Sequence, residues 1–392
     1  MGSLLKAWAV ATATAAFGVS SSLAQAVNYV VSSCKDFSAI PTPMRDDTHV
    51  LVTQDIACKS PQTVIVSGPY AYLVSSDLHS LELLNLRFSV KDGADFFFSL
   101  SAEEYQGTAA FISTGEQQFH GGTFKIDIGS SATFGVPVTF SASAVVPGKR
   151  GGAIFNNGYL TFEQTAKFDN NNVRPTDDSG EGGPDSSVTV SDVQDPTFGC
   201  GGAVYNGDLG TAAFRDVTWF TGNTAGNGGG GGAVCNQGVA VFSSRTYFTG
   251  NVAEEDAQGE GGHGGAIYTT ATGITTFRRK ANFRNNRGGT KGGAVHSAGI
   301  TTLQRSAVFS GNMASTREAG SGGHVFSSGV FEVEGDATFR SGKASRNGGA
   351  LFVSRTGDAS FNGILEFIDN EAGGLCEDVY DASSPNVCLS VE

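Results

Sequence analysis

The chain has 392 residues, with 55 glycines, 28 phenylalanines, 3 methionines and a formal net charge of −13 at pH 7. Abundant glycine and phenylalanine with little methionine disfavours long helices and favours many tight turns between short strands. The negative charge argues against general nucleic-acid binding, which needs a positive field to displace counterions from phosphates.

The N-terminus, residues 1–24, has the pattern of a secretory signal peptide. Lys6 precedes an apolar run over residues 7–19, and small residues lead to a predicted cleavage near Ala24 or Ala26. No later apolar stretch reaches the roughly 18 residues that a membrane-spanning helix needs. The sequence therefore predicts a secreted, extracellular protein with no transmembrane segment after signal removal.

Six cysteines indicate disulfide bonds in an oxidising compartment. Two local pairs are expected, Cys34 with Cys58 and Cys376 with Cys388. Cys200 and Cys235 fall in neighbouring repeats, at strand registers that differ by roughly 16 Å at 3.3 Å per residue. That separation is too long for a disulfide unless Cys200 lies in a loop folded back over the strand, so this third pairing is left open.

Residues 25–120 repeat poorly, although they are rich in apolar runs such as Leu78–Phe88 and Phe96–Phe98. We expect an N-terminal cap and irregular first coils here.

From residue 121 to 372 the chain repeats a Gly-Gly pair, in most units followed by Ala. The steps are 26 to 33 residues, apart from one of 50 that contains an acidic segment, residues 174–199, expected to be a loop insertion. The pairs begin at Gly121, Gly151, Gly201, Gly231, Gly264, Gly292, Gly322 and Gly348.

Each unit also carries two aromatic or aliphatic residues six positions apart, as in Phe214 and Phe220. An even spacing points both side chains to the same face of an extended chain. An Asn follows three residues after the second aromatic, at a turn where we expect its amide to bond to the next coil. Gly342 interrupts this Asn series. These features predict an all-β, right-handed parallel β-helix with three strands per coil, closed by a cap over residues 373–392.

The Gly-Gly-Ala-Ile/Val and Phe-x-x-Asn motifs resemble the repeats of the chlamydial polymorphic outer membrane proteins. Examples are Gly151–Ile154 with Phe168–Asn171, and Gly292–Val295 with Phe309–Asn312. The resemblance spans about residues 121 to 372 and implies surface display and adhesion. The β-helix architecture is also similar to that of pectin lyase-like enzymes, although a fold does not transmit a function.

The fourth residue after the start of each Gly-Gly pair is predicted to face outward, which gives one side chain per coil in a column. Stacked aromatic side chains suit sugar rings or a protein partner. The simpler alternative is that the insertion or ordinary stacking covers this column. The column contains Phe155, Tyr205, Cys235, Tyr268, His296, Phe326 and Phe352, of which Tyr205, Tyr268, His296 and Phe326 are candidate ligand-binding residues. Trp219 and Tyr247 form a second, smaller outward pair. This pair either binds a ligand or is covered by the insertion or by ordinary stacking.

Eight basic and no acidic residues lie between Gly261 and Arg317. Arg278 and Arg284 each follow an inward Phe and should point outward. A basic stripe on a flat sheet suits an anionic polysaccharide such as a uronan, since Arg bonds carboxylates in a bidentate manner. The alternative is that these charges only solubilise the surface.

No convergent acid–base cluster, nucleophile motif or metal-ligand spacing appears. His263, His296 and His324 fall at different offsets in their coils, and the acidic residues of 174–199 lack calcium-loop spacing. We therefore expect no catalytic, metal or cofactor site. The predicted function is a secreted repeat protein that binds a glycan or a cell-surface protein through its faces. The alternative is a polysaccharide lyase, hydrolase or epimerase.

Overall fold

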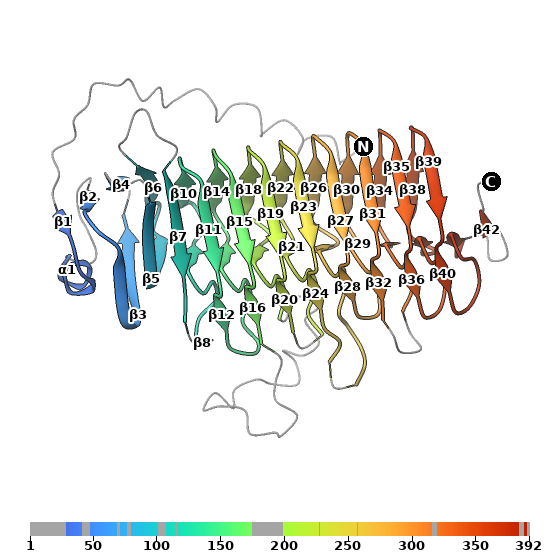
Figure 1. Ribbon diagram of the computed structural model, residues 1–392, viewed down its shortest axis with the longest axis horizontal. Coiled ribbons are helices and arrows are strands. Elements are labelled where there is room, and N and C mark those ends of the chain that lie inside the picture. The colour runs from blue at the N-terminus through green and yellow to red at the C-terminus, as the bar shows by residue number, and fades with distance from the viewer. Residues whose placement is uncertain are drawn as a thin grey trace.

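The computed structural model describes residues 29–40, 48–68, 71–76, 80–100, 107–114, 116–174, 199–226, 228–256, 258–315, 320–383 and 388–389. In these residues, strands of successive repeats stack in parallel along one long axis (Figure 1). The all-β, parallel β-helix prediction is thus confirmed. The predicted signal peptide, and all of the insertion except residues 174 and 199, lie outside the described residues.

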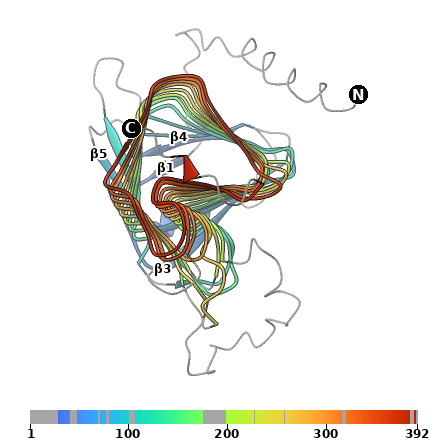
Figure 2. The same ribbon diagram turned by 90° about the vertical axis from the view of Figure 1, so that its right-hand side faces the viewer.

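The end-on view shows the coils superimposed around a common interior (Figure 2). Sheet A is one wall of this tube, with 12 strands. Its strands are β1 (Tyr29–Val31), β2 (Thr48–Val52), β4 (Ala71–Ser76), β6 (Asp95–Leu100), β10 (Ser131–Phe134), β14 (Tyr159–Phe162), β18 (Thr211–Phe214), β22 (Val239–Phe242), β26 (Ile274–Phe277), β30 (Ile300–Leu303), β34 (Val330–Val333) and β38 (Asp358–Phe361).

Sheet B has 21 strands in two rows, which meet in the long strands β3 (Ile56–Ser67) and β5 (Ser80–Lys91). The first row holds β7 (Thr108–Ile112), β11 (Val138–Ser141), β15 (Ala166–Asp169), β19 (Thr218–Thr221), β23 (Thr246–Thr249), β27 (Ala281–Arg284), β31 (Ala307–Ser310), β35 (Ala337–Arg340) and β39 (Leu365–Ile368). The second row holds β9 (Phe124–Ile126), β13 (Ile154–Asn156), β17 (Val204–Asn206), β21 (Val234–Asn236), β25 (Ile267–Thr269), β29 (Val295–Ser297), β33 (Val325–Ser327), β37 (Leu351–Val353), β41 (Val379–Asp381) and β42 (Cys388–Leu389).

Sheet C is made of nine two-residue strands that lie between the two rows of sheet B in the chain. They are β8 (Glu116–Gln117), β12 (Ala144–Val145), β16 (Asn172–Val173), β20 (Thr224–Ala225), β24 (Val252–Ala253), β28 (Arg287–Gly288), β32 (Met313–Ala314), β36 (Lys343–Ala344) and β40 (Glu371–Ala372). A regular coil therefore has four strands, not the expected three, because the turn after the ladder Asn forms its own short ladder. The right-handed sense of the coil stays a prediction.

The interior is filled by the aromatic residues that keep the six-residue spacing. Phe220 is fully buried and stacks between Phe168 and Phe248, with ring centroids 4.7 and 4.9 Å away. Each buried Phe contributes roughly 2 kcal/mol before conformational entropy is counted. The same-face prediction is confirmed, since residues such as Phe214 and Phe220 meet edge-on across the tube.

The Gly-Gly pairs serve two geometric needs. The first glycine of each pair has a positive φ, as in Gly231 with φ 64°, which glycine adopts without steric cost. The second glycine packs against the next coil, because a Cβ on Gly232 would overlap the carbonyl oxygen of Gly265. The pair thus provides a positive φ at its first glycine and a close approach of coils at its second.

The Asn residues form a continuous buried ladder. Asn223 Nδ2 donates to Asn251 Oδ1 at 2.9 Å and to the Phe168 carbonyl at 2.9 Å, while its Oδ1 accepts from Asn171. The residue with a left-handed backbone in this turn is the one before the ladder Asn, such as Gly222 with φ 62°. The Asn amide therefore makes the hydrogen bonds of the turn, and the residue before it adopts the left-handed backbone.

Where the Asn ladder is interrupted, a histidine from another position of the repeat takes the place of the missing Asn side chain. Gly342 stands where the ladder Asn is missing, and a Cβ there would overlap the His324 ring. His324 Nδ1 lies 2.9 Å from Asn312 Nδ2, the donor that would otherwise reach the next Asn. His324 replaces the usual Ala of its repeat, so the two departures from the pattern compensate each other.

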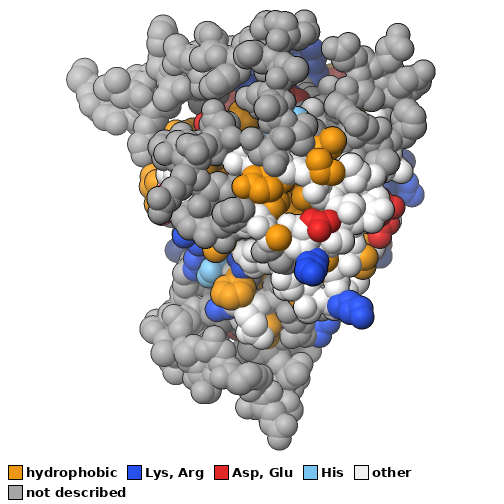
Figure 3. Space-filling model, turned by 90° about the vertical axis from the view of Figure 1, so that its left-hand side faces the viewer, with side chains coloured by type: hydrophobic (Ala, Val, Ile, Leu, Met, Phe, Trp, Pro, Cys, Tyr) orange, Lys and Arg blue, Asp and Glu red, His pale blue; other side chains and the backbone are white. Residues whose placement is uncertain are grey.

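Both ends carry a disulfide where the sequence predicts it. Cys34–Cys58 ties the helix α1 (Cys34–Ala39) to β3, and Cys376–Cys388 lies beside the antiparallel pair β41 and β42. Phe37 of α1 is buried, so the helix covers core at the N-terminal end, whose described surface mixes hydrophobic and charged side chains (Figure 3). No helix among the described residues is long and apolar enough to cross a membrane.

Candidate functional site

The outer face of the first row of sheet B carries a group of side chains that we call the aromatic–basic patch, namely Trp219, Tyr247, Arg245, Lys280 and Arg284. Alternate residues of a strand share a face, so the outward side of this row is set by the buried Phe220, Phe248 and Phe283 between them. The register places Trp219 beside Tyr247 and Thr249 beside Arg284. The patch thus spans three neighbouring coils.

Two aromatic rings form the centre of the patch. Trp219 and Tyr247 stack with centroids 5.7 Å apart and an interplanar angle of 10°, and both are half-buried. Lys167 Nζ lies 5.6 Å from the Trp219 ring centre. The pair gives a flat apolar surface of two coils, edged by polar groups, which is the arrangement that the faces of sugar rings favour.

Three exposed cations border the rings. Arg245 precedes Tyr247 by two residues, and Arg284 lies on the neighbouring strand. Two residues along a strand span about 6.6 Å at 3.3 Å per residue. Within the described residues no ion pair involves Arg245, Lys280 or Arg284. These charges are therefore available to an anion at the edge of the rings.

Around the corner toward sheet A lies an open hollow of about 650 Å³. Its lining is entirely polar or charged, and it includes Arg278, the second predicted arginine. The lining residues are Ser243, Arg278, Arg279, Gln304, Arg305 and Glu334. The structure thus places Arg284 in the patch and Arg278 in this adjacent hollow.

The four candidate ligand-binding residues of the outward column are buried, so the reading in which they are exposed to a ligand is corrected; Phe352, at the end of the column, is half-buried. Tyr205, Tyr268, His296 and Phe326 are 3 to 8% exposed. Described residues between sheet C and the second row lie against them, such as Gly230, where an added Cβ would overlap the Tyr268 ring. Arg150 lies 5.3 Å from the Tyr205 ring centre and Lys291 lies 5.6 Å from that of Phe326. The column is a second, small core outside the tube, and the covered alternative is the one observed.

Two histidines of this outer core lie against each other. His263 and His296 have ring centroids 5.0 Å apart, and His296 Nε2 lies 3.1 Å from Ser328 Oγ. Burial, with Lys291 nearby, lowers the pKa of His263 to about 3, and burial lowers that of His296 well below its ordinary value. Both histidines are therefore neutral packing residues at neutral pH.

The disulfide left open by sequence is formed. Cys200 and Cys235 are bonded, with Cα atoms 5.7 Å apart. Cys200 is fully buried on the outer core beside Tyr205, so it lies in a segment folded back over the column. A folded-back segment is the arrangement that the sequence spacing requires for a Cys200–Cys235 disulfide.

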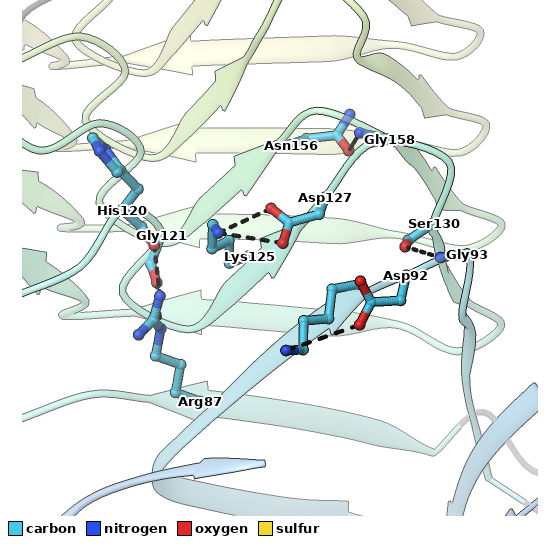
Figure 4. A network of polar contacts seen from close by, with 11 residues as sticks. Arg87, Asp92, Gly93, His120, Gly121, Lys125, Asp127, Ser130, Asn156 and Gly158 are labelled. Atoms are coloured by element: carbon cyan, nitrogen blue, oxygen red, sulfur yellow. Dashed lines mark hydrogen bonds and ion pairs between the residues drawn. The ribbon is translucent and has the colours of Figure 1, made fainter. Parts of the chain in front are cut away.

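A second group of cations, near the N-terminal end, has a structural role (Figure 4). Arg87 is buried and donates to the carbonyls of Gly121 and His120 at 3.2 and 2.9 Å. Lys125 pairs with Asp127 at 2.9 Å. Burial and the neighbouring cations, Arg150 foremost, lower the pKa of His120 to about 4. Arg87 therefore ties β5 to the first Gly-Gly turn.

Sequence reasoning missed Arg245 as a member of the site, because it lies before the acid-free stretch. Strand parity could have found it, because Arg245 lies two residues before Tyr247, which the sequence predicts to face outward. In the described residues no group of three or more His, Cys, Asp or Glu side chains could hold a metal ion.

Residues 245–270 match the Chlamydia polymorphic membrane protein repeat, which confirms the resemblance inferred from the motifs. The matched stretch includes Tyr247, the Phe248–Asn251 motif and the Gly264–Ile267 motif. Searches of the curated proteins and of the solved structures gave no match. The repeat match, the β-helix and the disulfides fit a surface repeat protein.

Proposed function

We propose that the protein is secreted and binds an anionic glycan outside the cell through the aromatic–basic patch. One observation carries the proposal: Trp219 and Tyr247 stack in line on an outer face and are bordered by cations with no ion-pair partner in the described chain. Sugar rings pack on the aromatic faces, and carboxylates or sulfates of the glycan bond the guanidinium groups.

The surroundings limit the patch to a short stretch of ligand. Asp169 lies beside Thr221 on one side of the central coils, and Glu366 lies further along the row that contains Trp219 and Tyr247. These carboxylates disfavour a long polyanion that follows the whole tube. The patch therefore suits a few sugar units with one or two charges.

The test is a glycan array probed with wild type, Trp219→Ala and Arg284→Ala, followed by titration with any glycan that binds. We expect each variant to weaken binding about 5- to 10-fold, and binding to weaken as salt rises because the charges are exposed. Tyr159→Ala is the matched control, since Tyr159 is 57% exposed on sheet A.

Equal binding by the patch variants and wild type contradicts the proposal. Release of shortened or unsaturated sugars during the titration would instead support the polysaccharide-active enzyme.

A further inference from the structure

The corner hollow lies on four consecutive coils in strict register. Backbone bonds fix this register: Arg278 N donates to the Phe242 carbonyl, Gln304 N to that of Phe277, and Glu334 N to that of Leu303, at 2.8 to 2.9 Å. Ser243, Arg278, Gln304 and Glu334 therefore follow one another at the same corner position. Adjacent parallel strands lie about 4.8 Å apart. Arg278 and Glu334 are two coils apart, so their backbones are separated by about 10 Å.

Opposite charges line this one space without forming an ion pair. In the described residues, neither Glu334 nor Arg278, Arg279 or Arg305 takes part in an ion pair. Arg278 and Arg279 lie on one coil of the hollow and Arg305 on the next, so three guanidinium groups offer donors to an anion in this space. Glu334, on the coil after Arg305, offers a carboxylate that can accept hydrogen bonds from hydroxyl groups, and the Gln304 amide lines the same hollow.

We propose that the hollow is a subsite for one acidic sugar unit, with its carboxylate on Arg278, Arg279 and Arg305 and its hydroxyl groups on Glu334. The inference rests on the proposed glycan binding, because it assigns the class of sugar at the edge of the same ligand. A neutral sugar lacks the group that the arginines bind, and a bare anion lacks the hydroxyl groups and is repelled by Glu334.

The experiment is calorimetric titration of the full chain with sodium glucuronate, glucose and inorganic sulfate. We expect glucuronate to bind, glucose not to bind, and Arg279→Ala/Arg305→Ala to weaken glucuronate at least 10-fold. Glu334→Gln distinguishes a sugar subsite from a general anion site, because it should change the affinities for glucuronate and for sulfate in opposite directions. It should weaken glucuronate if the carboxylate accepts hydroxyl groups, and strengthen sulfate because a negative charge is lost.

The controls are matched to each change. Glu332→Gln removes the same charge two residues away and should leave the preference for glucuronate over sulfate unchanged, and Arg340→Ala removes an exposed arginine outside the hollow. Tyr159→Ala, on sheet A outside both the patch and the hollow, should leave glucuronate binding unchanged. Circular dichroism of each variant checks that the fold is kept.

The subsite is overturned if wild type does not bind glucuronate, or if Glu334→Gln strengthens glucuronate and sulfate alike. Loss of glucuronate binding in Trp219→Ala would place the sugar on the rings instead and also overturn it. If glucuronate binds as expected but no glycan depends on Trp219 or Arg284, the proposed function fails and the subsite stands.

Discussion

The inside of the tube and the outer face of sheet B follow opposite rules. Inward positions repeat from coil to coil, as in the stacked Phe168, Phe220 and Phe248. Outward positions of the same strands change at every step, from Lys167 to Trp219, Tyr247 and Asn282. Since each inward side chain packs on its equivalent, repetition there stabilises the fold, whereas outward positions are free to serve binding.

The largest expected effect is in the repeated core. Phe220→Ala should lower the free energy of unfolding by about 3 to 5 kcal/mol, because it leaves a cavity between two stacked rings. Its neighbour Trp219→Ala, on the outer face, should cost about 1 kcal/mol. Urea unfolding measures both, and equal losses would contradict the distinction between the two faces.

The Asn ladder comes next. Asn251→Ala leaves the Phe220 carbonyl and the Asn223 N–H without their buried partner, and we expect a loss of about 2 to 4 kcal/mol from two unsatisfied groups. Asn282→Ala, on the outer face, is the control and should change the stability by less than about 0.5 kcal/mol.

The compensation at the ladder's interruption gives a sharper test. His324→Ala removes the partner of Asn312 and should cost about 2 kcal/mol, while Gly342→Asn alone places a side chain against the imidazole. The double variant restores the pattern of the other coils. We expect it to be within about 1 kcal/mol of wild type, so a thermodynamic cycle should show strong coupling. Additive effects would mean that the histidine does not replace the Asn.

Acid should weaken the outer core and the ladder. Burial holds the pKa of His263 and His324 at about 3, below the value of about 6.5 in an unfolded chain. The unfolded state therefore binds protons first as pH falls. Stability is complete above pH 6.5 and is lost between 6.5 and about 3, by about 1.4 kcal/mol per pH unit for each such histidine. His296→Phe, which keeps the stacking, should reduce this slope in urea unfolding measured from pH 7 to 4.

The smallest effects on stability belong to the patch cations. Arg245→Ala and Lys280→Ala should change the free energy of unfolding by less than about 0.5 kcal/mol, since both are exposed and unpaired in the described chain. The same variants should weaken glycan binding. A stability loss above about 1 kcal/mol would make these residues part of the fold.

The sequence predicts the inside of the molecule better than its outside. Six-residue spacing and constant parity place Phe214 and Phe220 in the core because stacking enforces both rules over many coils. The same parity correctly turns Trp219, Tyr247 and Tyr205 away from the tube. It cannot show that a loop covers Tyr205 and leaves Tyr247 half-exposed, since that depends on how chain segments of irregular length fold back.

The same limit explains the other differences. The two-residue strands of sheet C carry no hydrophobic period, so β20 (Thr224–Ala225) reads as part of a turn. The Cys200–Cys235 bond depends on a folded-back segment that spacing alone cannot place. The patch required Arg245, which is identified by its register with Lys280 and not by the composition of its own segment.

The enlarged repeat enters and leaves its insertion without shifting the ladders. Before it, Arg174 N donates to the Val145 carbonyl at 3.1 Å, and after it Gly151 N donates to the Cys200 carbonyl at 3.0 Å. The Cys200–Cys235 disulfide further anchors the chain to the next coil directly after the insertion. The ladders on both sides of this junction, β16 with β20 and β13 with β17, keep the register of the other coils, so a change of length at this one junction is not passed along the rod.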